Sequence, residues 1–88
     1  MCGIAGYFGN KDISKFKIKK TLEMMKNRGP DYQNYTEIIS PKKKITFLHS
    51  RLSIIDLKKR SNQPFYSDEL CVIFNGEIYN YIELRNSL

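Results

Sequence analysis

The 88-residue sequence has only two cysteines, no long apolar run and no signal peptide. Two cysteines are too few for the disulfide framework of a small secreted domain. No apolar stretch approaches the ~20 residues of a membrane-spanning helix, and the N-terminus lacks a basic region followed by an apolar core. We also find no internal repeat or linker. These absences predict a soluble, cytoplasmic chain without a membrane partner, forming at most one small domain.

Acidic residues are also few, since 15 lysines and arginines face 9 aspartates and glutamates. The net charge of +6 raises the question of nucleic-acid binding. The basic residues lie mainly in three clusters, 15–20, 42–44 and 58–60, where a solvated helix face or turns are expected. No zinc-finger spacing, basic zipper or aromatic RNA-binding motif accompanies them. We therefore predict a solubilising surface and no nucleic-acid partner, with a non-catalytic basic binding module as the alternative.

The first third of the chain predicts a strand followed by a helix. Residues 4–8 are a short apolar segment typical of a buried strand. Ser14 is suited to cap a helix that runs to about residue 26, with apolar residues spaced to form one face. Gly29-Pro30 ends this helix, because proline disfavours a helical residue before it.

The remaining residues predict further strands and a second helix. Strands are expected at 32–39 and 45–50, antiparallel across a turn, and a surface loop at 56–64. Residues 70–74 are uninterrupted apolar, as in a strand covered on both faces. Asn80, with Glu83 three residues later, resembles a capped helix start. Only two turns follow it, which is expected of a piece of a longer domain.

Cys2 is the first candidate for chemistry. Initiator methionine is readily removed before a small side chain, which makes Cys2 the first residue. Its thiol then lies near a free α-amino group of pKa ~8, which can serve as its general base. A small buried thiol at a strand start is the structural alternative.

Five segments in order resemble class II glutamine amidotransferases, and asparagine synthetases in particular. Their similarity covers essentially the whole chain. The segments are Met1-Cys2-Gly3-Ile4-Ala5-Gly6, Arg28-Gly29-Pro30-Asp31, His49-Ser50-Arg51-Leu52-Ser53-Ile54-Ile55-Asp56, Gln63-Pro64-Phe65 and Phe74-Asn75-Gly76-Glu77-Ile78-Tyr79-Asn80.

The resemblance implies a role for each matching residue. Cys2 is implied as the nucleophile, with Asn75 and Gly76 as oxyanion donors. Arg51 is implied to pair with the glutamine α-carboxylate, a task that suits its planar fork. The other substrate-binding residues that it implies are Leu52 and Ile54, at the pocket wall, and Glu77, near the α-amino group.

The residues themselves leave other interpretations open. Asn75-Gly76 is also typical of a type I′ hairpin turn. Arg51 also fits a solvent-facing charge at a strand end, and Glu77 an ordinary surface carboxylate. We expect His49 to be structural, because a nucleophile with its own amine needs no histidine, and Cys71 to be an inert core thiol.

The resemblance implies an α+β fold: the N-terminal half of a four-layer αββα N-terminal-nucleophile hydrolase sandwich with antiparallel sheets. Residues 1–88 are expected to form part of the glutaminase domain, with the synthetase domain absent. Glutamine and that synthetase domain are the implied partners, and a homodimer is one assembly open to the full-length form. No metal or cofactor is expected in this chain, because ATP and Mg belong to the synthetase domain. The ammonia acceptor is aspartate or, alternatively, a sugar in polysaccharide biosynthesis.

Overall fold

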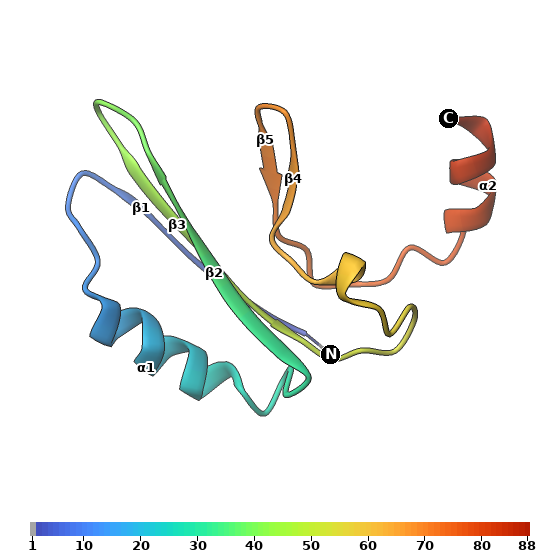
Figure 1. Cartoon of the computed structure of the whole chain (residues 1–88), viewed down its shortest axis with the longest axis horizontal. Helices are drawn as coiled ribbons and strands as arrows, with labels where there is room; N and C mark the ends of the chain where they lie inside the picture. The colour runs from blue at the N-terminus through green and yellow to red at the C-terminus, as the bar shows by residue number, and fades with distance from the viewer. Residues whose placement is uncertain (1) are drawn as a thin grey trace.

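A computed structural model describes residues 2–88, which form two helices, one short 3-10 turn and five strands (Figure 1). In chain order the elements are β1 (Gly3–Gly9), α1 (Lys15–Met25), β2 (Tyr32–Ile39), β3 (Lys44–Arg51), the 3-10 turn η1 (Lys59–Ser61), β4 (Phe65–Ser67), β5 (Leu70–Val72) and α2 (Tyr81–Ser87).

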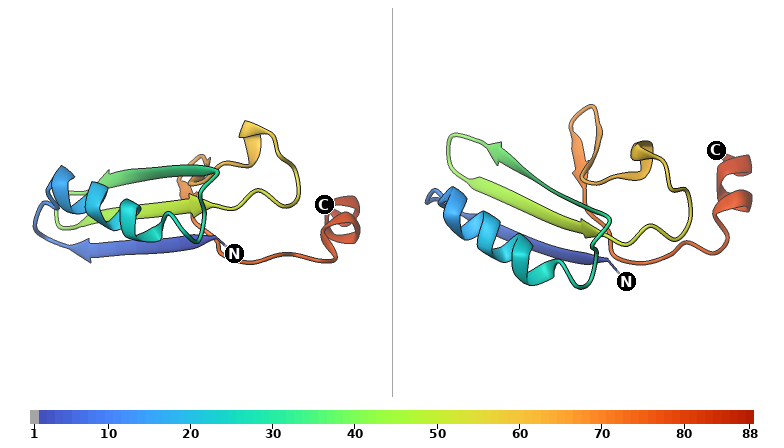
Figure 2. Two further views of the ribbon diagram at one scale, coloured as in Figure 1. Left: turned by 90° about the horizontal axis from the view of Figure 1, so that it is seen from below. Right: turned by 60° about the horizontal axis from the view of Figure 1, so that its bottom comes forward.

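The first three strands form an antiparallel sheet in the order β1-β3-β2. Strand β3 lies in the centre, where Gly3 of β1 and Gln33 of β2 both pair with Ser50. Helix α1 covers one face of this sheet, and the β4–β5 hairpin and α2 lie on the other side of it (Figures 1 and 2). The pairing brings the start of β1 and the end of β3 to the same corner of the molecule.

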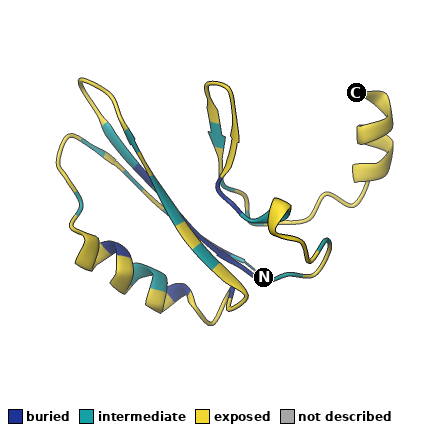
Figure 3. Cartoon of the chain, viewed as in Figure 1, coloured by how far each residue is buried: buried dark blue, intermediate teal, exposed yellow. Residues whose placement is uncertain are grey.

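Helix α1 begins where the sequence predicts it. The Ser14 side chain accepts a hydrogen bond from the backbone nitrogen of Lys17 at 3.3 Å, which caps the first turn. Ile18 and Met25 then pack against Leu48 of β3 to form the core cluster. Burial is concentrated at this interface, at the end of β3 and at Gln63-Pro64, while the lysines of α1 are exposed (Figure 3). The basic cluster at 15–20 is therefore a solvated helix face.

The segment after α1 fastens the end of β3. Gly29 lies so close to this strand that an added Cβ would come within 2.2 Å of the Ser50 carbonyl carbon. Asp31 donates its backbone N–H to the Arg51 carbonyl oxygen at 3.0 Å and accepts the Ser53 N–H on its carboxylate at 2.7 Å. Only glycine at position 29 allows the backbone to come this close to β3. This contact and the two Asp31 hydrogen bonds fix the backbone from Ser50 to Ser53.

The second half departs from the predictions at two points. The strand predicted at 70–74 is present over Leu70–Val72, but it forms one half of a hairpin in which Leu70 and Val72 are exposed rather than covered on both faces. A two-residue turn joins β4 to β5, with Asp68 at a φ of 46°, a conformation that aspartate tolerates better than most residues. Asn80 precedes α2 without a side-chain capping bond, because its backbone is not extended as a cap requires.

The predicted α+β class with antiparallel sheets is confirmed. The four-layer sandwich stays a prediction. Neither of the helices found within residues 2–88 has the length and apolar character needed to cross a membrane.

Candidate functional site

Cys2 lies beside the segment that leaves β3. It directly precedes β1, and the pairing of Gly3 with Ser50 places it next to Leu52. The Leu52 backbone nitrogen donates to the Cys2 sulfur at 3.3 Å, and the thiol reaches the Leu52 carbonyl oxygen at 3.8 Å. The thiol is half-buried and forms no disulfide. The predicted removal of Met1 concerns a residue outside the described range.

A cavity of about 220 Å³ opens at Cys2. Its walls come from the chain start, the segment after β3 and the segment after β5, which are remote from one another in sequence. Six of the seven predicted site residues line it, namely Cys2, Leu52, Ile54, Asn75, Gly76 and Glu77. Tyr79 also lines it, and the sequence offered only its place in the last motif as a signal.

Arg51 is the predicted residue that does not line this cavity. It borders a neighbouring hollow of about 160 Å³ that Cys2 and Gly76 also line. The side chain is buried, so a solvent-facing charge is excluded. Its guanidinium donates to the loop after β3: to the carbonyl oxygens of Ile55, Asp56 and Lys58 and to the Asn62 side chain at 2.7 Å. In this structure the Arg51 guanidinium therefore binds the loop that follows β3.

Asp56 organises that same loop. Its backbone has a φ of 48°, and its carbonyl oxygen accepts from Arg51. Its carboxylate accepts hydrogen bonds from the Arg60 guanidinium, the Lys58 backbone N–H and the Ser61 hydroxyl, at 2.7 to 3.1 Å. These bonds lower the pKa of Asp56 to about 2, and the bond from Arg60 has the largest effect. Both the backbone carbonyl and the side-chain carboxylate of Asp56 therefore stabilise the loop.

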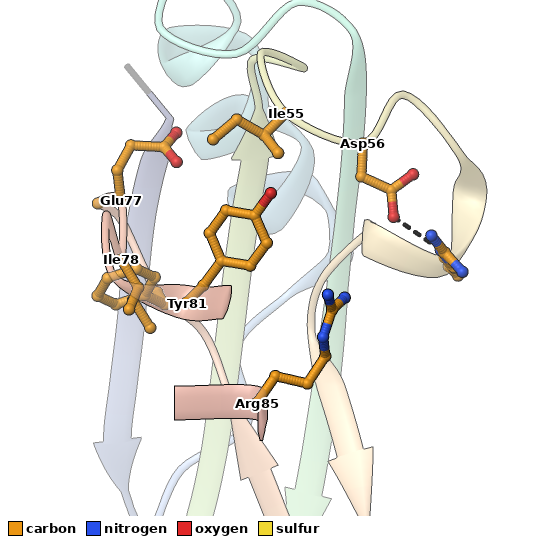
Figure 4. Close-up of a pocket in the computed structure, with 9 residues that line it drawn as sticks. Ile55, Asp56, Glu77, Ile78, Tyr81 and Arg85 are labelled. Atoms are coloured by element: carbon orange, nitrogen blue, oxygen red, sulfur yellow. Dashed lines mark hydrogen bonds and ion pairs between the residues drawn. The ribbon is translucent and has the colours of Figure 1, made fainter. Parts of the chain in front are cut away.

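A larger hollow of about 550 Å³ lies between this loop and α2 (Figure 4). The Asp56–Arg60 ion pair and Arg85 of α2 border it. Gly76 and Glu77 line both this hollow and the cavity at Cys2, whereas Cys2 lines only the latter of the two. A substrate that meets the thiol is therefore expected in the smaller cavity.

The segment Asn75-Gly76 does not form a hairpin. A type I′ turn needs positive φ at both central residues, and neither residue has it. The close neighbour of Gly76 is the ring of Phe74, which an added Cβ would approach to 2.8 Å. The ring lies over the Gly76 backbone, so a larger residue at this position would have to displace it.

His49 is fully buried, with its Nε2 at 3.2 Å from the Phe74 carbonyl oxygen. A carbonyl only accepts, so Nε2 carries the proton. Burial lowers the pKa of His49, which keeps the ring neutral. Its Nδ1 meets no hydrogen-bond partner within the described part of the chain.

Cys71 is half-buried in β5 and is not the core thiol that the sequence suggested. The short hairpin leaves it only partly covered. Across residues 2–88, no group of three or more His, Cys, Asp or Glu side chains is arranged to hold a metal ion.

Comparison with known proteins gives a consistent family. The family described as "Glutamine amidotransferase domain" matches residues 1–88. The chain is 39% identical to asparagine synthetase [glutamine-hydrolyzing] 1 of Bacillus subtilis, over all of the chain and 14% of the relative. It is 38% identical to the corresponding synthetase of Sandersonia aurantiaca, over all of the chain and 17% of the relative.

Asparagine synthetase [glutamine-hydrolyzing] 1 of Saccharomyces cerevisiae is likewise 38% identical, over 97% of the chain and 15% of the relative. The chain therefore spans only 14–17% of the length of these curated relatives. No solved structure gives a significant match.

Proposed function

Because the chain belongs to the glutamine amidotransferase domain family, we propose that it is the glutaminase portion of a glutamine-dependent asparagine synthetase. Glutamine is hydrolysed to glutamate and ammonia, and the ammonia is used to amidate aspartate. One observation carries this proposal: the thiol of Cys2 shares a cavity of about 220 Å³ with Asn75, Gly76 and Glu77. A nucleophile, oxyanion donors and a carboxylate for an ammonium group are the parts that amide hydrolysis of an amino acid requires.

The nucleophile is the sulfur of Cys2. Once Met1 is removed, the α-amino group of Cys2 takes the thiol proton as the sulfur attacks the side-chain amide carbon of glutamine. The same amine then returns the proton to the departing nitrogen, which leaves as ammonia, and a thioester remains. Water hydrolyses this thioester to glutamate and regenerates the thiol.

The oxyanion of each tetrahedral intermediate is held by Asn75 and Gly76. The Asn75 side-chain amide and the Gly76 backbone N–H are the donors. Preorganised donors of this kind stabilise the transition state more than the ground state, and losing one typically costs roughly 10²–10³-fold in kcat. The Leu52 N–H donates to the Cys2 sulfur instead.

The amino-acid end of glutamine is held by Arg51 and Glu77. Glu77 pairs with the α-ammonium group, and the backbones and side chains of Leu52 and Ile54 form the wall. Arg51 gives up one of its hydrogen bonds to the loop and binds the α-carboxylate of glutamine in its place. The contact with the Ile55 carbonyl oxygen is the longest of the guanidinium, at 3.5 Å, and is the one we expect to be exchanged.

The acceptor half of the reaction lies outside these residues. We propose that aspartate activation, with its need for ATP and Mg, belongs to a synthetase domain in the same polypeptide, as the names of the relatives suggest. Residues 1–88 then supply ammonia to that domain.

The direct test measures ammonia release from glutamine by the protein at its natural length, together with its intact mass. We expect glutamine-dependent ammonia release and a mass that lacks Met1. A retained Met1 converts the proposed base into an amide, which accepts no proton at neutral pH. Activity from a protein that retains Met1 therefore excludes this mechanism, and absence of any glutaminase activity refutes the proposal.

A further inference from the structure

Both backbone hydrogen-bonding groups of Phe74, the residue that leads into Asn75-Gly76, are bound by one side chain. The Phe74 backbone nitrogen donates to Gln63 Oε1 at 2.6 Å, and Gln63 Nε2 donates to the Phe74 carbonyl oxygen at 3.1 Å. Since a backbone N–H can only donate, this orientation of the Gln63 amide is the one that satisfies both bonds. The pair takes the place of a neighbouring strand at a point where β5 has ended.

The surroundings make this contact rigid. Gln63 is only 9% exposed, and the fully buried His49 shares the Phe74 carbonyl oxygen. The Phe74 ring in turn lies against Gly76. The backbone of Phe74 is therefore held by Gln63 and His49, and its ring contacts Gly76.

We propose that Gln63 is a positioning residue for the oxyanion site: it sets where the Asn75 amide and the Gly76 N–H point. The inference rests on the proposed function and extends it to a residue outside the Cys2 cavity. The two bonds from one planar amide hold the peptide planes on both sides of the Phe74 Cα, whereas a single bond would hold only one of them. Oxyanion donors act only within a narrow range of geometry, and a displacement of about 1 Å costs up to roughly 100-fold in rate.

The test uses three variants of the protein at its natural length. Gln63→Ala removes both bonds. Gln63→Glu keeps an acceptor for the Phe74 N–H but has no proton for the Phe74 carbonyl oxygen at neutral pH. Gln33→Ala is the matched control, because Gln33 also uses its amide nitrogen on a backbone carbonyl, that of Leu22, away from the Cys2 cavity. The readouts are kcat and KM for glutamine and the rate at which iodoacetamide alkylates Cys2.

Alkylation by iodoacetamide forms no oxyanion, so it reports on the thiol alone. We expect both Gln63 variants to lower kcat about 10–100-fold, with KM and the alkylation rate changed by less than about threefold. The kcat of Gln63→Glu relative to wild type rises as the pH falls from about 8 to about 5, because burial raises the pKa of the introduced carboxyl and its protonated form donates again.

Unchanged kcat in a folded Gln63 variant overturns the inference. So does an equal loss of kcat in Gln33→Ala at matched stability, which indicates general destabilisation. If Gln63→Ala does not fold, the pH dependence of Gln63→Glu is the test of the inference. A kcat of Gln63→Glu relative to wild type that does not change with pH then overturns it. Absence of wild-type glutaminase activity refutes the proposed function instead, so the two failures are distinguishable.

Discussion

The backbone N–H of Leu52 points at the sulfur of Cys2, with 3.3 Å between nitrogen and sulfur. This contact joins residues 50 positions apart and exists because β1 pairs with β3. Hydrogen bonds to a charged acceptor are stronger than those to a neutral one, so the N–H supports the negative charge that develops on the sulfur as it attacks.

Leu52→Pro removes this donor and tests its effect on the thiol. Arg51 lies in a strand, which is the conformation preferred before proline. We expect alkylation of Cys2 by iodoacetamide at neutral pH to slow roughly 3–10-fold, in line with the net energy of one typical hydrogen bond, about 0.5–1.5 kcal/mol. Leu52→Ala keeps the N–H and serves as the control. Equal rates in the two variants would contradict this role for the contact.

The two cysteines are expected to differ in function. Cys2→Ala abolishes glutamine hydrolysis in the protein at its natural length. Cys71→Ala, in the half-buried β5 position, leaves kcat unchanged and alters stability by less than about 1 kcal/mol. A diazo-ketone analogue of glutamine, followed by peptide mass spectrometry, should label Cys2 and spare Cys71. Equal labelling would show that Cys2 has no special activation.

The strands of the first sheet follow directly from the sequence, whereas parts of the site do not. Residues 32–39 are predicted and observed as a strand, because apolar and β-branched residues are bounded there by turn residues. The sequence does not predict strand β4, because three residues are too few to show an alternating apolar and polar pattern. The position of Arg51 was unpredictable for a different reason: its partners are mostly backbone carbonyl oxygens, which every residue has.

Asp31 and Gln63 show the same limit. Both belong to segments that the sequence singled out, yet neither received a role. Their contacts with Ser53 and Phe74 depend on how separate segments meet in space. Motif order therefore predicts residues that line one cavity, whereas only the tertiary structure shows how the segments that carry them are held.

The loop that Arg51 binds is expected to loosen in acid. Hydrogen bonds, that of Arg60 first, lower the pKa of Asp56 to about 2 in the folded chain, against about 3.9 when unfolded. A lowered folded-state pKa means that the carboxylate stabilises the fold fully above about pH 4 and ceases to do so as the pH falls through about 2. An NMR titration of the Asp56 carboxyl carbon measures this directly. Arg60→Gln should raise that pKa, and a wild-type midpoint near 4 would contradict the network.

Gly29→Ala is expected to destabilise the fold. The added Cβ would lie 2.2 Å from the Ser50 carbonyl carbon, so backbone must shift, at a cost of about 1–3 kcal/mol or more. Gly6→Ala is the matched control in β1, where the Cβ meets its nearest atoms at an ordinary 3.6 Å. Its effect should stay below about 1 kcal/mol. Urea unfolding of both variants decides, and equal destabilisation would show that close approach at Gly29 is not the cause.

The last prediction concerns residues 1–88 prepared on their own. The buried apolar core consists of Ile18, Met25 and Leu48, a small set to offset backbone entropy of roughly 1–2 kcal/mol per residue. The β4–β5 hairpin meanwhile exposes 69% of Leu70 and 51% of Val72, and within the described residues each of its strands has one unpaired edge. Exposed apolar strands with open edges are templates for association.

We therefore expect these 88 residues to associate in a concentration-dependent manner and to release no ammonia from glutamine. Leu70→Lys should weaken the association, measured by analytical ultracentrifugation, because a charge on the hairpin opposes edge pairing. Phe16→Lys, at an equally exposed apolar position on α1, is the control and should change it little. A dilute monomer with a cooperative thermal transition and glutamine-dependent ammonia release would show instead that these residues suffice as a glutaminase.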